Sequence, residues 1–146
     1  MAITQALANS FKKELLEAEH NFKSSGGDKF KIALYTSSAT LNSATTSYTT
    51  GNEVGASGQY VAGGGALVNG GTSIASGVAI VDFADRSFTG VTLTARGALI
   101  YNTSATVANA AVAALDFGAD KTATSGTFTI QFPAFTTSAA ILRISG

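Results

Sequence analysis

The chain has 146 residues, a length that fits one domain, and 45% of them are hydrophobic, which excludes an intrinsically disordered chain. The net charge is zero and cysteine is absent, so the composition excludes a basic nucleic-acid-binding surface, disulfides and cysteine-based metal sites. Only 12% of residues are charged, about half the usual share, and residues 1–31 hold 9 of the 18 charged side chains.

Residues 4–22 are predicted to form an amphipathic helix, because apolar side chains recur there at three- and four-residue spacing. This stripe consists of Ile3, Leu7, Phe11, Leu15, Ala18 and Phe22. Thr4 is the expected N-cap, and Gly26 and Gly27 are expected to end the helix. His20 is expected on the solvated side. The stripe must be buried, and packing against the chain's own β body is favoured over packing against a partner.

The remaining chain shows strand patterns. Residues 29–36 alternate and predict a half-buried strand, with Phe30, Ile32 and Leu34 on one face. The Ser/Thr/Gly-rich residues 41–65 predict a long loop with one short strand near residues 59–62. Further strands are expected at residues 66–69, 72–75, 78–83, 91–102, 108–117, 127–132 and 141–144. Residues 108–117 are rich in alanine, so a helix is the alternative there.

Frequent short strands separated by glycine turns predict a mainly β fold. We expect an antiparallel β-sandwich or partly open barrel with one N-terminal amphipathic α-helix. The chain is expected to form a single domain over residues 1–146, with the helix and a turn in residues 1–27 and the β body in residues 28–146. No uninterrupted apolar run reaches the length of a membrane span, so no membrane partner is expected.

Two acidic pairs are the main candidates for chemistry: Asp82 with Asp85, and Asp116 with Asp120. Paired carboxylates can act as acid and base or bind calcium. The favoured interpretation is structural: Asp82 and Asp116 end strands, accept backbone N–H groups in turns, and pair with Arg96 or Arg86. EF-hand spacing is absent, and His20 is expected to lack the rigid network of a catalytic triad. We therefore expect no enzyme activity, catalytic residue, metal or cofactor.

Six stretches spread over nearly the full length are informative in their order and combination: MAITQALANSFKKELL, KFKIALYTSSATLNSATTSYTTGNEV, VDFADRSF, TARGALIYN, LDFGADKT and TFTIQFPA. Together they resemble a family of small virion proteins of tailed bacteriophages. The resemblance implies a structural component of the virion, made in the host cytoplasm. It carries no catalytic residues over to this chain.

The low charge favours a surface that neighbours cover, although a Thr/Ser-rich monomeric surface is the alternative. The leading hypothesis is a capsid decoration (cement) protein that binds the outer face of the major capsid protein lattice. Its partners would be the major capsid protein or other virion proteins and further copies of itself, with a trimer favoured, and no nucleic acid.

A tail, neck or fibre component is the alternative, with Tyr48 and Tyr60 in the long loop available for recognition. A carbohydrate-binding β domain is the second alternative, in which hydrolysis would need Asp82 and Asp116 to face each other across a cleft. The candidate structural and interface residues are Leu7, Phe11, Leu15, Phe22, Tyr48, Tyr60, Asp82, Arg96 and Asp116.

Overall fold

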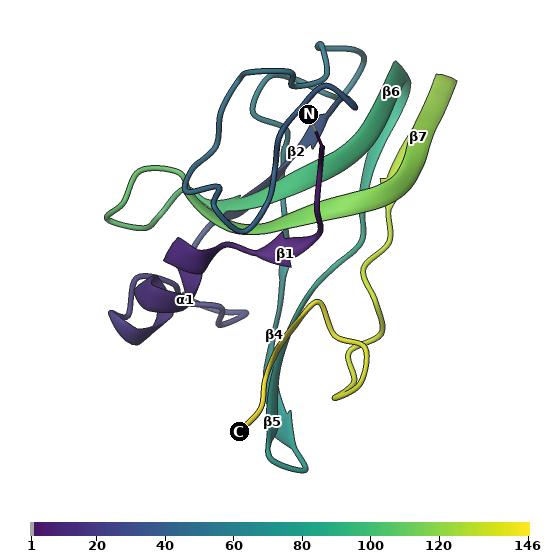
Figure 1. Cartoon of the computed structure of the whole chain (residues 1–146). Coiled ribbons are helices and arrows are strands. Elements are labelled where there is room, and N and C mark those ends of the chain that lie inside the picture. Colours follow the sequence, from purple (N-terminus) through teal and green to yellow (C-terminus); the bar gives the residue numbers. More distant parts are fainter. Residues whose placement is uncertain (1) are drawn as a thin grey trace.

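A computed structural model describes residues 2–146, which form a five-stranded and a three-stranded antiparallel sheet and one short helix (Figure 1). The elements are β1 (Ala6–Leu7), α1 (Asn9–Leu16), β2 (Phe30–Tyr35), β3 (Gly65–Ala66), β4 (Asn69–Ala75), β5 (Val78–Phe83), β6 (Arg86–Asn102), β7 (Ala110–Ile130) and β8 (Leu142–Ile144). The larger sheet has the order β1-β7-β6-β2-β3, and the smaller has the order β4-β5-β8. The predicted mainly β, sandwich-like fold with one N-terminal helix is confirmed.

The larger sheet is built around a long, curved hairpin of β6 and β7, which have 17 and 21 residues (Figure 1). Their register shifts at several points, including between Ala95 and Gly97, and such irregularities bend a strand and increase its twist. The strands predicted at residues 108–117 and 127–132 are one strand here. Gly118 adopts a φ of +80° without ending the strand.

Strand β2 lies between β6 and β3 and is more deeply buried than predicted. The predicted strand is confirmed, but its expected half-buried character is wrong, because Lys31 is its only partly exposed residue. The long loop covers the second face, where the Tyr35 hydroxyl donates a hydrogen bond to the Thr49 carbonyl at 2.6 Å. The predicted loop is confirmed, but the short strand at residues 59–62 is wrong. Tyr60 instead closes a turn with Ser57.

The predicted helix at residues 4–22 is wrong in length, because α1 spans only Asn9–Leu16. Ala6 and Leu7 are extended and pair with Ala114 and Ala113 at the edge of β7. This edge supplies main-chain partners that a helix beginning at Thr4 would forgo. The helix stops well before the glycines, since Ala18 turns the chain with a φ of +60°.

Six aromatic rings join the helix to both sheets, and we call them the aromatic cluster: Phe11, His20, Phe22, Phe30, Phe83 and Phe132. The rings of Phe22 and Phe30 stack at 4.6 Å between centroids. Phe83 meets Phe30 edge-on at 5.5 Å and Phe132 at 5.7 Å. Burying one such ring contributes about 2–3 kcal/mol, so the cluster is a major part of the contact between the sheets.

His20 is buried inside this cluster, so the expected position on a solvated helix face is wrong. The chain turns back after α1, and the His20 Nε2 comes within 2.9 Å of the Glu14 carboxylate. On the other side, the Asn102 side-chain amide lies 2.9 Å from His20 Nδ1 and donates to Asp28 at 2.8 Å. Two buried polar side chains, Glu14 and Asn102, thus have internal partners, as buried polar groups require.

Gly64 is expected to tolerate no side chain. Its φ is +82°, and a Cβ there would lie 1.8 Å from the Ile32 carbonyl oxygen of β2. Gly64→Ala should lower the free energy of unfolding by about 3 kcal/mol or more, measured by urea denaturation. Gly26→Ala is the control, because Gly26 has a φ of +74° but open space around it, so only about 1 kcal/mol of backbone strain is expected. Equal losses in the two variants would contradict the collision.

His20→Ala should lower the free energy of unfolding by about 3 kcal/mol, because it leaves a cavity and removes the partner of the buried Glu14 carboxylate. Lys13→Ala breaks the exposed ion pair with Glu17 at 2.9 Å and should leave the urea midpoint unchanged. The comparison fails if removal of the surface pair costs as much as removal of the buried one.

Candidate functional site

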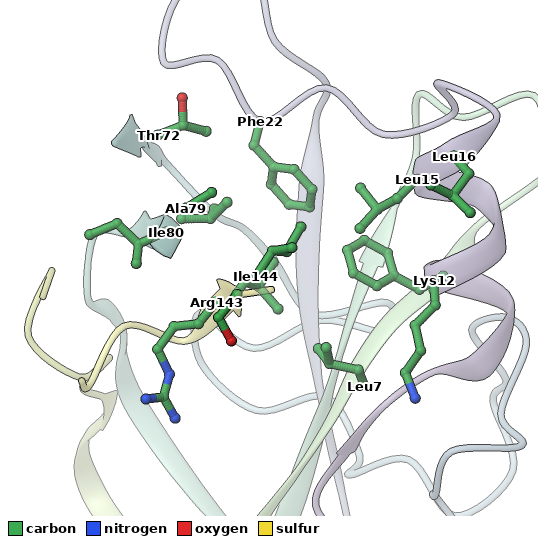
Figure 2. Close-up of a pocket in the computed structure, with 14 residues that line it drawn as sticks. Leu7, Lys12, Leu15, Leu16, Phe22, Thr72, Ala79, Ile80, Arg143 and Ile144 are labelled. Carbon is green, nitrogen blue, oxygen red and sulfur yellow. The ribbon is translucent and has the colours of Figure 1, made fainter. Parts of the chain in front are cut away.

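An open groove of about 580 Å³ lies between the N-terminal segment and the smaller sheet (Figure 2). One side is formed by Leu7, Phe11, Leu15, Leu16 and Phe22. The other side is formed by residues of all three strands of the smaller sheet, among them Thr72, Ala79, Val81, Leu142 and Ile144. The groove is therefore mainly apolar, and its two sides come from distant parts of the chain.

The four candidate residues of the N-terminal segment meet in this groove. Phe11 and Phe22 are buried in the aromatic cluster, and they also line the groove. Leu7 and Leu15 pack against the core but remain partly exposed. The apolar stripe thus divides between packing inside the molecule and lining an open surface.

Exposed apolar residues extend the groove beyond the predicted stripe. Leu16 at the end of α1 is 91% exposed, and Ile144 of β8 is 60% exposed. Strand pairing places Ile74, which is 72% exposed, in one row with Ala79 and Ile144 on one face of the smaller sheet. No local pattern marks these residues as part of a site, because Leu16 lies outside the stripe and β8 is only three residues long.

The charged residues that line the groove are Lys12 and Arg143. Lys12 Nζ donates a hydrogen bond to the side-chain oxygen of Asn9 at 3.3 Å, and Arg143 donates to the Ser138 carbonyl at 2.9 Å. In the described part of the chain, no aspartate or glutamate lines the groove. Its electrostatic character is therefore positive.

A second feature is the gathering of all four tyrosines around Glu53, which we call the tyrosine cluster: Tyr35, Tyr48, Tyr60, Tyr101 and Glu53. The Glu53 carboxylate accepts hydrogen bonds from the Tyr48 hydroxyl, from the Tyr60 hydroxyl at 2.8 Å and from the Gly63 N–H at 2.8 Å. These bonds attach the long loop to itself. Leu34 of β2 donates its N–H to the Tyr60 hydroxyl at 2.7 Å, which attaches the loop to the sheet.

The tyrosine cluster limits what the long loop can offer to a partner. Tyr60 is fully buried and its hydroxyl is used internally, so it cannot contact another molecule at this surface. Tyr48 is partly buried, and its ring stacks on Tyr101 at 4.8 Å. Both candidate recognition residues thus hold the loop in place. Glu53, which no motif in the sequence marks, connects them.

Among the acidic candidates, Asp116 makes the predicted pairing and accepts a backbone N–H, but the prediction that it ends a strand is wrong, because β7 continues to Ile130. Asp116 forms an ion pair with Arg96 at 3.5 Å and accepts the Gly118 N–H at 2.9 Å. The pairing predicted for Asp82 is wrong. Its Oδ1 is buried without a hydrogen-bond partner, and the guanidinium of Arg86 lies over the Phe88 ring at 4.7 Å instead.

Asp82 lies in β5 of the smaller sheet, whereas Asp116 lies in β7 of the larger one. Within residues 2–146, no hydrogen bond or ion pair joins them. In the same range, no group of three or more His, Cys, Asp or Glu side chains is placed to hold a metal ion. None of the helices described has the length and apolar character needed to cross a membrane.

Comparisons with protein-family models, curated proteins and solved structures found no match to this chain.

The tyrosine cluster predicts an unusual alkaline titration. Burial, followed by the Glu53 charge, raises the pKa of Tyr101 to about 12, and burial raises the pKa of the other three tyrosines well above the ordinary 10. Absorbance at 295 nm should therefore show no tyrosinate in the folded protein between pH 10 and 11. Because the folded pKa values are raised, their stabilisation is complete below pH 10 and is lost as pH rises through about 12. Each of the four tyrosines contributes a quarter of the tyrosinate absorbance. If a quarter of that absorbance appeared near pH 10, one tyrosine would have an ordinary pKa, which would contradict its burial.

Proposed function

We propose that this chain is a structural protein of a bacteriophage particle, and specifically a capsid decoration (cement) protein on the outer face of the major capsid protein lattice. The observation that carries the proposal is the open apolar groove, in which Leu16 and Ile144 are each more than half exposed. Ile74, which is also more than half exposed, continues the row of Ala79 and Ile144 beside it. Contiguous exposed apolar surface of this kind is typical of a protein that is covered by a partner.

The polar surface also supports assembly. Much of it consists of serine and threonine, and pairs such as Ser87 with Thr129 and Thr94 with Thr122 bond across β6 and β7 at 2.9 Å. Surfaces low in charge can be covered without removing many ions from water, a step that is costly. The resemblance to small phage virion proteins is the reason why the assembly proposed is a bacteriophage particle.

A cement protein acts through many copies, so each contact can be modest. The proposal includes a homo-oligomer, with a trimer favoured, and contact with the major capsid protein. A tail, neck or fibre position is the alternative, and the number of copies in each particle distinguishes the two.

The proposal predicts hundreds of copies distributed over the head, measured by quantitative mass spectrometry and immunogold labelling of purified particles. Six or twelve copies at one vertex would support the tail or neck alternative. Absence from the particle would contradict the virion role altogether.

The groove predicts a specific defect in assembly. Leu16→Asp with Ile144→Asp should change the urea midpoint little, because both side chains are exposed. The same variant should lose incorporation into particles by roughly tenfold or more, since a charge would be buried without a partner. Val61→Asp with Val107→Asp is the matched control, because these residues are exposed and lie outside the groove. Equal loss in the control would remove the groove from the proposal.

A further inference from the structure

The groove borders a free sheet edge. Strand β8 pairs with β5 and has no strand partner on its other edge within residues 2–146. All three residues of β8 line the groove, so this free edge belongs to a strand that borders it. Unpaired N–H and C=O groups at such an edge are a template for an added strand.

An added strand would continue the apolar rows of the smaller sheet. Register places Val81 beside Leu142, and Ala79 beside Ile144. A strand laid along β8 would bring alternate side chains into the space that separates these rows from Leu7, Leu15 and Leu16 (Figure 2). Those inward side chains must be apolar, because the surfaces that they would contact are apolar.

The charges on the groove specify the other face of the added strand. Lys12 and Arg143 lie on opposite sides of the groove (Figure 2), and no ion pair forms at either side chain in the part of the chain described. Their hydrogen bonds go to neutral oxygens of Asn9 and Ser138. A partner with carboxylates satisfies both cations, whereas a basic partner is repelled by both.

We infer that the groove binds an extended segment of the partner protein in which apolar and acidic residues alternate, added as a fourth strand along β8. The inference rests on the proposed assembly function, because it names the chemistry of the segment through which that assembly occurs. The main chain of β8 gives affinity, the apolar rows give register, and Lys12 with Arg143 give selectivity for acidic segments.

The test uses the full chain and a fluorescein-labelled synthetic peptide containing Glu-Val-Glu-Val-Glu-Val. Fluorescence anisotropy should show it binding roughly tenfold or more tightly than the Lys-Val counterpart. Amide NMR shifts should be largest at residues 142–145 and at Leu16. Lys12→Glu with Arg143→Glu should reverse the preference, so that the Lys-Val peptide binds better.

Two controls separate selectivity and strand addition from general attraction. Lys23→Glu with Lys121→Glu makes the same change of charge at exposed lysines outside the groove and should leave the preference unchanged. Two versions of the acidic peptide can be N-methylated, one at the odd-numbered and one at the even-numbered peptide groups; we call these the two phases of N-methylation. One phase should abolish binding and the other should leave it. Only the peptide groups that face β8 donate main-chain hydrogen bonds to it.

Several results would overturn the inference. These are equal binding of the acidic and basic peptides, no binding of either, and NMR shifts confined to the edges of β3 or β4. Equal tolerance of both N-methylation phases also contradicts strand addition. If sedimentation showed a dimer and the NMR signals of residues 142–145 were broadened in it, the occupant of the groove would be a second copy of this chain instead.

The particle experiment keeps this inference separate from the proposed function. Normal incorporation of the Lys12→Glu, Arg143→Glu variant would contradict the acidic segment while leaving the virion role intact. Absence of the wild-type protein from particles would contradict the virion role, and the peptide measurements would still decide what the groove binds.

Discussion

The stack of Phe22 on Phe30, at 4.6 Å and with the rings nearly parallel, is the contact on which the arrangement of the molecule depends. Phe22 follows the helix, Phe30 begins β2, and Phe83 ends β5 against both rings. One cluster thus fixes the helix, the larger sheet and the smaller sheet relative to one another. Because the groove lies between the helix and the smaller sheet, its shape is a consequence of this packing.

Local patterns predicted the strands well and the helix poorly. Alternation identified β2 and the second half of β7, whereas the alanine-rich first half of β7 was predicted from the surrounding β pattern. The apolar stripe from Ile3 to Phe22 fits the spacing of a helix over its whole length, but Ala6 and Leu7 pair with the edge of β7 instead. Propensity cannot include a strand edge that forms from residues a hundred positions later. The burial of His20 was not predicted either, because it depends on the early end of the helix and on contact with Asn102, far along the chain.

The candidate site could be predicted only in part. Leu7, Phe11, Leu15 and Phe22 were found because they share a period, and the structure brings them to one groove. The opposite side comes from β4, β5 and the short β8, and nothing local marks those strands as its partners. The tyrosine cluster shows the converse: Tyr48 and Tyr60 suggested an exposed recognition loop, but hydrogen bonding to Glu53 turns them inward.

The three residues of β8 also set an order of events in folding. The β4–β5 hairpin can form locally, because its two strands are adjacent in the sequence. Strand β8 also pairs with β5, but the whole β6–β7 hairpin lies between these two strands in the sequence. Pairing of Arg86 with Ile130 brings the two ends of this hairpin together, so β8 can reach β5 at low entropic cost only once the hairpin has formed. Because β8 has three residues and lies at the edge of its sheet, we expect it to be among the first elements to open in hydrogen exchange. One side of the groove therefore exists only in the finished fold. On the proposed function, partially folded chains would lack the surface that binds the partner, so assembly would select completed subunits.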